Sequence, residues 1–535
     1  MKLIVEQEKK IQNFVPTSIY EINGIFTNSK HNMILNAQLE KKIEDKKKMK
    51  NILTLCINST FTVKKITIKQ EKKYPPAPFT TSSLQQEAYN TLNFSISKTM
   101  FLAQQLYEKG FITYLRTDST NLSKNILSKI KHFILYSCGK KYLSEKNFLK
   151  KNNQFSSQEA HEAIRPTMIN IDKYYLNPLD TFQKRLYKLI WKRTIIGQMT
   201  EALIEKRNIY IQSSHLKYLF IYTNKTVLFD GFMKIFDNEK KEEPNIDILQ
   251  IKKGFCLKKT EIIAKQIIKN QLKRYNEASL VKKLEQLGIG RPSTYVPIIL
   301  TIQKRNYINI QKISKKIETR ETFLLKENLI TKKNNQVIKI EKNKLFPTEI
   351  GILITDFLIK NFYEIMKYSF TANLEENFDA IAKGKQSWIK IIENFHSKFY
   401  EKIQYVNKHV EKIHKARFLG IDPKTHKKIF VKIARYGPVI QLGEFNKKEK
   451  PKFSPLLNTQ KMDKISLSEA LKMLELPKSL GLFNKIEISL KINKYNIYIK
   501  YDNLSIPIDK KIFFHDSINY EKAVDIIIQN KIIKN

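Results

Sequence analysis

The residues best suited to chemistry lie in the stretch FITYLRTDS, residues 111–119, where Tyr114, Arg116 and Asp118 alternate. Along an extended strand, residues i, i+2 and i+4 share one face. We therefore expect a short strand on which a phenol stands beside a guanidinium. This pairing suits a tyrosine nucleophile held next to a phosphate, because the cation neutralises charge that grows during attack. An ordinary buried tyrosine near an Arg–Asp pair is the alternative, and this stretch alone leaves both interpretations open.

A second cluster lies in SSQEAHEAIRPT, residues 156–167, where His161 and Arg165 are four positions apart. This spacing places both side chains on one face if the segment is helical. Pro166 then ends the helix at Arg165. A histidine and an arginine at a helix end can bind phosphate or move a proton. A solvated helix end without a ligand is the alternative.

The third cluster spans residues 277–308 and reads as a helix, a turn at Gly288–Gly290, and a second helix that begins near Ser293 and Thr294. Arg291 precedes that second helix. Free backbone N–H groups at a helix N-terminus, together with an arginine, favour an anion such as phosphate. A helix–turn–helix unit without a ligand fits the same pattern.

These clusters must be positioned by elements that the composition separates. The prolines and hydroxyl residues of EKKYPPAPFTTSSLQQEAYN, residues 71–90, mark a boundary followed by a helix start. We expect a helix-rich block over 81–205, short strands over 206–275, and helices again from Glu277 to about residue 400. The tail contains a weak repeat, since residues 429–442 resemble residues 488–501, and each copy is followed by a helical pattern.

Charge and cysteine content restrict the class of protein. The chain has 535 residues and a net charge of +45, which favours nucleic acid as a partner. Only 11 of the 96 basic residues are arginine, and lysine, isoleucine and asparagine share A- and T-rich codons, so genomic drift also raises the charge. Three isolated cysteines without a Cys-x-x-Cys pair indicate a reducing cytoplasm and no zinc ribbon. No apolar run approaches the roughly 20 residues that span a bilayer, so we expect no membrane association.

Taken together, these segments resemble the bacterial type IA DNA topoisomerases. The resemblance covers roughly residues 1–400 and rests on eight segments, which occur in the same order as in the family. They are PPAPFTTSSLQQEA, GFITYLRTDSTNLS, QEAHEAIRPT, LYKLIWKRTIIGQM, FDGFMKIF, RYNEASLVKKLEQLGIGRPSTY, LFPTEIG and FTANLEENFDAIAKGKQSW. The tail segment RFLGIDPKTHKKIFVKIARYGPVIQLGE resembles C-terminal repeats of members without zinc ribbons.

The resemblance implies roles for individual residues. Tyr114 matches the family's nucleophile, which becomes joined to the 5′ phosphate of a cleaved DNA strand and so conserves the bond energy without ATP. Arg116 would stabilise the phenolate and the phosphate, and His161 matches an active-site histidine. The resemblance assigns Thr113, Thr117 and Asp118 to the DNA-binding site mainly as residues that position the strand. The other residues that it places near bound DNA are Arg165, Arg193, Arg291 and Ser293.

The sequence departs from the family in its acidic residues. Family members carry a Toprim domain that holds Mg²⁺ through a glutamate and an Asp-x-Asp-x-Glu motif, and no Asp-x-Asp occurs in this sequence. The stretch LIVEQEKKIQNFVP, residues 3–16, resembles a segment just past that domain. We therefore expect no metal ligands in this chain, and a separately encoded Toprim polypeptide as a partner beside single-stranded DNA.

The expected activity is ATP-independent relaxation of negatively supercoiled DNA in the bacterial cytoplasm, at the nucleoid. The alternative is a non-catalytic remnant that binds single-stranded DNA. The fold implied is a mainly α-helical, multi-domain toroid fragment with a β-rich arch, followed by repeat modules. We expect a topoisomerase region over 1–405 and a repeat region without zinc ribbons over 406–535. Within the former, 1–40 and 276–405 form a split helical domain, 41–80 and 206–275 the arch, and 81–205 a gate carrying Tyr114.

Overall fold

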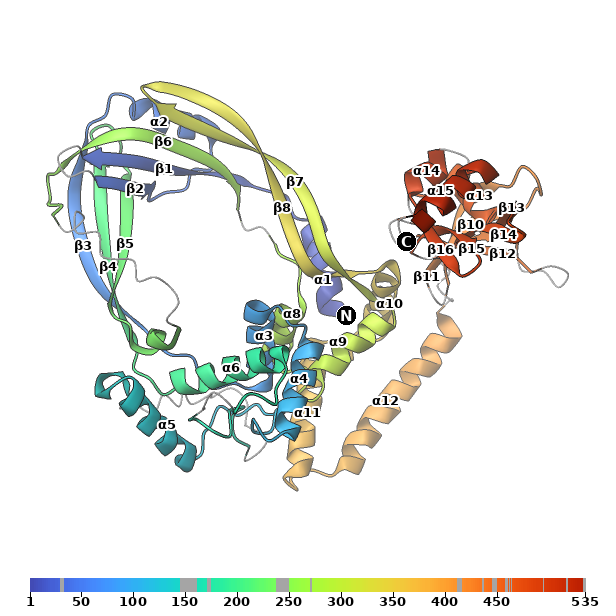
Figure 1. The fold of residues 1–535 in the computed structure, drawn as a ribbon, viewed down its shortest axis with the longest axis horizontal. Coiled ribbons are helices and arrows are strands. Elements are labelled where there is room, and N and C mark those ends of the chain that lie inside the picture. Colours follow the sequence, from blue (N-terminus) through green and yellow to red (C-terminus); the bar gives the residue numbers. More distant parts are fainter. Residues whose placement is uncertain are drawn as a thin grey trace.

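The computed structural model describes most of the chain. The described residues are 1–28, 33–144, 161–170, 175–236, 250–269, 272–410, 416–434, 437–444, 450–457, 460, 462, 464–493, 495–515 and 518–532. Their elements form a ring in which a long, curved sheet makes one side and helices make the other (Figure 1). The C-terminal part lies outside this ring, beyond the last long helix (Figure 1).

The curved side of the ring is an eight-stranded antiparallel sheet with the order β1-β2-β5-β4-β3-β6-β7-β8. Its strands are β1 (Ser18–Asn28), β2 (Met33–Leu39), β3 (Phe61–Lys73), β4 (Ala202–Ser213), β5 (Leu219–Phe229), β6 (Cys256–Ile268), β7 (Ile308–Lys326) and β8 (Leu329–Pro347). Because β6 also pairs with β1, the first six strands close on themselves. Phe26, Phe61 and Phe220 pack together in the core of this closed part, with ring centroids 5.0 to 6.2 Å apart. Helix α2 (Lys46–Leu55) covers it.

Strands β7 and β8 correct the expectation of helices throughout 277–400. They form one long hairpin whose register runs from Ile308 opposite Pro347 to Lys326 opposite Leu329. The turn residues Glu327 and Asn328 both have positive φ, 48° and 66°, which matches the twist of a tight two-residue hairpin. The isoleucines at 310, 313 and 317 are three and four positions apart, a spacing typical of a helix, and the long-range pairing of the two strands overrides this local pattern.

Two other expectations about the arch also change. Residues 18–28 and 33–39, expected in the split helical domain, form β1 and β2 of the sheet. The fold is mixed α/β and not mainly α, because the sheet takes strands from segments on both sides of the gate.

The expected gate region is helical. Its elements are α3 (Thr81–Leu92), α4 (Ile96–Glu108), α5 (Lys124–Ser137), the 3₁₀ turn η1 (Lys140–Tyr142) and α6 (Thr181–Ile196), followed beyond β5 by the turn η2 (Gly231–Phe236). The hydroxyl-rich start of α3 forms the cap that the sequence predicts, since Thr80 and Ser83 make a reciprocal capping box. The proline-containing stretch 74–78 contains no regular element, as expected at a boundary. Leu84, Leu106 and Tyr187 are fully buried between α3, α4 and α6.

The remaining helices complete the ring. They are α1 (Lys2–Gln12), α8 (Glu277–Gln286), α9 (Tyr295–Lys304), α10 (Glu349–Asn361), α11 (Tyr368–Ala382) and α12 (Trp388–His409). Gly288 and Gly290, in the predicted turn between α8 and α9, both have positive φ, 65° and 81°. Helix α8 packs against α3, so this part of the ring touches the gate. Helix α12 then leads toward the C-terminal part (Figure 1).

The C-terminal part contains two antiparallel four-stranded sheets. The first holds β9 (Ala416–Ile421), β10 (Lys428–Ala434), β11 (Gly437–Leu442) and β12 (Lys452–Pro455), and the second holds β13 (Lys478–Phe483), β14 (Ile486–Ile492), β15 (Ile497–Tyr501) and β16 (Leu504–Ile508). Helices α13 (Leu467–Leu474), α14 (Lys510–His515) and α15 (Tyr520–Ile532) lie with them. The two similar sequence segments supply the two central strands of each sheet, and both sheets share one apolar core.

Candidate active site

The segment that carries Tyr114 is extended but is not a strand, which corrects the first expectation. Within residues 111–119 the only ladder-type pairing is an isolated bridge between Ile112 and Pro166. The expected period of two is nevertheless present, because Tyr114, Arg116 and Asp118 are exposed and the residues between them are buried. The three side chains therefore share the solvent side of the segment. The pairing does not continue past this bridge, because the backbone groups of Leu115 and Thr117 bond to Thr81.

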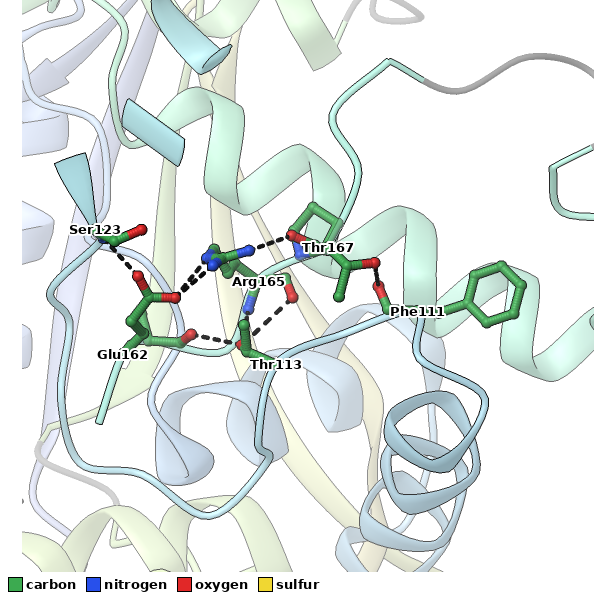
Figure 2. A network of polar contacts seen from close by, with 8 residues as sticks. Phe111, Thr113, Ser123, Glu162, Arg165 and Thr167 are labelled. Carbon is green, nitrogen blue, oxygen red and sulfur yellow. Dashed lines mark hydrogen bonds and ion pairs between the residues drawn. The ribbon is translucent and has the colours of Figure 1, made fainter. Parts of the chain in front are cut away.

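The first of these anchors is Thr113, directly before Tyr114. Its amide donates to the carbonyl of Arg165 at 2.9 Å, and its hydroxyl donates to the carbonyl of Ala163 at 2.8 Å. The Arg165 amide in turn donates to the Thr113 hydroxyl at 3.0 Å. Thr167 adds a hydroxyl bond to the carbonyl of Phe111, and Figure 2 shows these contacts side by side. The segment is thus tied to residues 163–167.

The second anchor is Thr81, in the first turn of α3. Its fully buried hydroxyl donates to the carbonyl of Leu115 at 2.7 Å and accepts the amide of Thr117 at 2.9 Å. The Thr81 amide donates to the carbonyl of Thr117 at 2.9 Å. The buried Thr117 hydroxyl accepts the Ser119 amide at 3.0 Å, so it shapes the segment from inside the protein. The backbone of Tyr114 and Arg116 lies between these bonded residues, which restrict its movement.

Tyr114 lies between two other rings. Its ring centroid is 5.5 Å from that of His161 with an interplanar angle of 33°, and 5.5 Å from that of Tyr107 with an angle of 68°. These are the tilted and edge-to-face arrangements that aromatic pairs favour. The Tyr114 side chain is still 37% exposed, so a ligand can reach its hydroxyl. The structure therefore brings together the tyrosine and the histidine, which are 47 positions apart in the sequence.

His161 does not lie on a helix, which corrects the second expectation. Residues 156–160 of the expected helix lie outside the described residues, and 161–165 have no helical structure. The reason is that this stretch uses its backbone for long-range bonds, with the Ile164 amide donating to the carbonyl of Phe79 at 2.8 Å and the Ala163 amide donating to that of Asn121 at 2.8 Å. The four-residue spacing therefore does not place His161 and Arg165 on one face of a helix.

Arg165 is held by Glu162. Its Nε donates to Glu162 Oε2 at 2.8 Å, its Nη2 lies 2.5 Å from the same oxygen, and its Nη1 donates to the carbonyl of Pro166 at 3.0 Å. The Glu162 Oε1 atom accepts the amide of Ser123 at 2.7 Å, so the carboxylate lies between Ser123 and Arg165 (Figure 2). Burial acts to raise the pKa of Glu162, but the bonds from Ser123 and the charge of Arg165 outweigh burial and lower that pKa.

Of the other predicted DNA contacts, Arg193 is engaged within the protein. Its Nε donates to the carbonyl of Ala77 at 2.6 Å, and its guanidinium lies 4.6 Å from the centroid of the Phe79 ring. Burial lowers the pKa of Arg193. In this conformation it fixes the proline-rich boundary to α6.

Arg291 lies close to two acidic side chains of α11, 3.7 Å from Glu375 and 3.6 Å from Asp379. Ser293 is exposed in the turn before α9. Burial raises the pKa of Tyr295 of α9 most strongly, the charge of Glu285 comes next, and the charge of Asp118 acts in the same direction. Asp118 of the first cluster therefore lies near the third cluster.

The contact between gate and ring also runs through Glu285. Its carboxylate accepts a hydrogen bond from the hydroxyl of Ser82 in the first turn of α3. Glu277, at the start of α8, accepts the amide of Ile96 at the start of α4 at 3.1 Å. Carboxylates at the N-termini of two gate helices interact favourably with both helix dipoles.

Metal ligands are not gathered in the part of the chain that the structure describes. No group of three or more His, Cys, Asp or Glu residues there could hold a metal ion. In the same residues no helix combines the length and the apolar composition needed to cross a membrane.

Sequence reasoning missed Thr81, Glu162 and Tyr107. A usable signal existed for the first, since TTSS offers four hydroxyls where a helix cap needs one. Glu162 lies between His161 and Arg165 in the sequence and is three positions from Arg165, a spacing at which side chains meet across a turn. Nothing in the sequence indicated that Tyr107 turns toward Tyr114.

Comparisons with known proteins agree on a family. A family profile described as DNA topoisomerase matches residues 1–341 and 328–393. A mimivirus protein (Acanthamoeba polyphaga mimivirus) named "DNA topoisomerase 1 type prokaryotic" is 34% identical, and the match covers 99% of this chain and 66% of that protein. The DNA topoisomerase 1 of Rickettsia felis is 32% identical, with 99% of this chain and 76% of that protein covered.

A solved structure, the full-length topoisomerase I of Thermotoga maritima, is also similar. It is 30% identical with a TM-score of 0.61, and the match covers 87% of this chain and 70% of that one. The chain thus spans about two thirds to three quarters of the length of these relatives.

Proposed function

The chain belongs to the type IA DNA topoisomerases, an isomerase family, and from this premise we propose that it breaks and rejoins one DNA strand through Tyr114. The Tyr114 oxygen attacks a backbone phosphorus, a phosphotyrosyl bond to the 5′ phosphate forms, and the bond to the 3′ oxygen breaks. Attack by the released 3′ hydroxyl reverses these changes. Since the ester conserves the bond energy, no ATP is needed. Between the two steps another strand passes, and negatively supercoiled DNA relaxes.

The observation that carries this proposal is the exposure of Tyr114 between two backbone anchors. Its ring is packed on His161 and Tyr107, and Arg116 lies on the same solvent side of the segment. A nucleophile fixed in this way meets a bound phosphate in one orientation, which lowers the entropic cost of attack. Arg116 would neutralise the charge that grows on the phosphate, and His161 would bind the phosphate or take part in proton movement.

We further propose that cleavage or rejoining requires Mg²⁺ held by acidic residues of another part of the enzyme. The sequence has no Asp-x-Asp, and the described residues bring no three potential ligands together. Mg²⁺ is commonly held by one or two carboxylates together with phosphate oxygens of the substrate. A Toprim polypeptide that supplies these carboxylates would complete the site.

The DNA partner that we propose is single-stranded. A net charge of +45 supports binding to a phosphate backbone, and the nucleophile needs access to one unpaired strand. The arch would act as a hinge for strand passage. The C-terminal sheets would act as two repeat modules.

The test is covalent trapping of a labelled single-stranded oligonucleotide, with Mg²⁺ and a Toprim polypeptide supplied, followed by a denaturing gel. We expect an adduct at the 5′ end of the cleaved strand, and Tyr114→Phe should abolish it because only the attacking oxygen is lost. Tyr136→Phe is the matched control, since Tyr136 lies on α5 and is 95% exposed.

An adduct in the Tyr114→Phe variant would show that another residue is the nucleophile. DNA binding without any adduct in the unaltered chain would favour the second candidate, a non-catalytic single-stranded-DNA-binding remnant. The absence of an Asp-x-Asp motif from the sequence is the observation that keeps this candidate open.

A further inference from the structure

A closed series of contacts links two of the groups proposed to act on the phosphate, Tyr114 and His161. Tyr114 follows Thr113, which is bonded to the backbone of Arg165. The Arg165 side chain is bonded to Glu162, and Glu162 follows His161, whose ring packs on Tyr114. The Glu162–Arg165 ion pair is the side-chain link that closes this series. Glu162 is therefore one covalent step from His161, and Arg165 is two steps from Tyr114, through Thr113.

We propose that Glu162 and Arg165 are positioning residues, which hold His161 against Tyr114 and do not themselves bind DNA. This inference rests on the proposed function, because positioning matters only if Tyr114 attacks a phosphate. It also assigns Arg165 a role different from the DNA contact that the sequence suggested. The Arg165 guanidinium would act as an internal support, or strut, that holds the His161 segment in place through Glu162.

The geometry around Arg165 supports a strut. Both Nε and Nη2 are directed at the Glu162 carboxylate, and Nη1 is directed at the carbonyl of Pro166. Every guanidinium nitrogen thus has a partner within this turn. The side chain is only 14% exposed, which restricts its access to a phosphate of bound DNA. Partial burial also means that salt screens this pair less than it screens a surface pair.

Glu162 is fixed from its other side as well. Its Oε1 accepts the Ser123 amide, which lies at the N-terminus of α5, where negative charge is favoured. The carboxylate thereby joins α5, the His161 segment and Arg165 at one point (Figure 2). Removing its charge should loosen the His161 segment and leave the exposed surface around Tyr114 unchanged.

The variant that tests this is Glu162→Gln, which keeps the shape and one acceptor oxygen. We expect adduct formation at saturating oligonucleotide to slow roughly tenfold to a hundredfold, as expected for a misplacement of about 1 Å. The dissociation constant for the oligonucleotide should stay the same. Arg165→Gln should behave alike, and the double variant should be no slower than either single variant, because both act through one contact.

A direct DNA contact by Arg165 predicts a different pattern. Arg165→Gln would then weaken oligonucleotide binding and reduce its salt dependence by about one phosphate contact. Glu162→Gln would tighten binding, since it would release the guanidinium. Either result, or additive slowing in the double variant, would overturn the proposal. Glu205→Gln is the matched control, because Glu205 pairs with Arg207, another 14% exposed arginine, on β4 in the arch.

A second readout does not depend on activity. The Thr113 amide is bonded to the carbonyl of Arg165, so its hydrogen exchange in the chain alone reports whether the His161 segment is loosened. We expect faster exchange of residues 111–119 in Glu162→Gln and no change in Glu205→Gln. If exchange is faster in Glu162→Gln but the unaltered chain forms no adduct, the positioning role of Glu162 and Arg165 is supported and the proposed function is refuted. Unchanged exchange would refute the strut.

If the Glu162→Gln variant unfolds at a much lower temperature than the unaltered chain, Arg165→Lys is used as the test variant instead. Lysine keeps the charge but cannot make the two-nitrogen contact with Glu162. Slower adduct formation at unchanged affinity would support the strut, and an unchanged rate would refute it.

Discussion

Replacing Thr81 by valine should release the tyrosine segment at its second anchor. Valine has nearly the same shape as threonine, so packing in the first turn of α3 is conserved and only the hydroxyl is lost. That hydroxyl is fully buried and serves two backbone groups, the carbonyl of Leu115 at 2.7 Å and the amide of Thr117 at 2.9 Å. Both groups would be left without this partner in a place that water does not reach.

The expected cost follows from these two bonds. A buried backbone group deprived of its partner costs roughly 1–3 kcal/mol, so two such groups cost about 2–4 kcal/mol after some relaxation. Local opening of the segment should then increase roughly 30- to 700-fold, at about 1.4 kcal/mol per factor of ten. The Thr81 amide still donates to the carbonyl of Thr117, so the segment is weakened and not detached.

Hydrogen exchange measured by mass spectrometry on the full chain is the suitable assay. It reports local opening, whereas melting of a multi-domain chain does not give a single free energy. The control is Thr91→Val on the same helix, because the Thr91 hydroxyl bonds only to the carbonyl of Glu87 at an exposed site. We expect Thr91→Val to change stability by less than about 0.5 kcal/mol. Exchange of residues 111–119 at the same rate in Thr81→Val as in the unaltered chain would refute the anchoring argument.

Three further outcomes are expected. Arg116→Ala should leave Tyr114 in place but slow adduct formation by on the order of a hundredfold, as for other charge-stabilising donors, and an unchanged rate would remove Arg116 from the chemistry. Affinity of the chain for single-stranded DNA, measured by fluorescence anisotropy, should fall steeply with salt because bound phosphates release counterions, and salt-independent binding would contradict this. Hydrogen bonds from Lys332 and Lys46 lower the pKa of Glu321 to about 2, so its stabilisation is present above the unfolded pKa and lost as pH falls toward 2. In hydrogen exchange, the protection of β7 should therefore decrease less between pH 5 and pH 3 in Glu321→Gln than in the unaltered chain.

The sequence predicted those features that depend on local rules. The cap of α3, the glycine turn before α9 and the alternation of exposed and buried residues around Tyr114 all follow from turn chemistry or periodicity, and all are present. The expected strand at Tyr114 and the expected helix at His161 are wrong for one reason. Both segments direct their backbone groups to partners far away in the sequence, and local propensity contains no information about these partners.

The long hairpin of β7 and β8 was missed for a different reason. Its isoleucines at 310, 313 and 317 have helical spacing, its flanks are helical and its many lysines also fit a solvated helix. Asn328 was the local signal for the turn, since asparagine adopts a positive φ readily, but Glu327 before it is not typical of such a turn. The closure of β6 onto β1 could not be read from either strand alone, because it depends on how the whole sheet twists.

The contacts that hold Tyr114 are nearly all internal to one unit. Both anchors, the rings of Tyr107 and His161, and the Glu162–Arg165 pair belong to residues 79–167. The hydrogen bonds described between this unit and α8 are two, from Ser82 to Glu285 and from the Ile96 amide to Glu277. On the proposed function, a gate that separates from α8 would break these two bonds and carry the phosphotyrosyl end away intact. The geometry of attack would then survive the movement, so the released 3′ hydroxyl could find the same phosphorus when the gate returns.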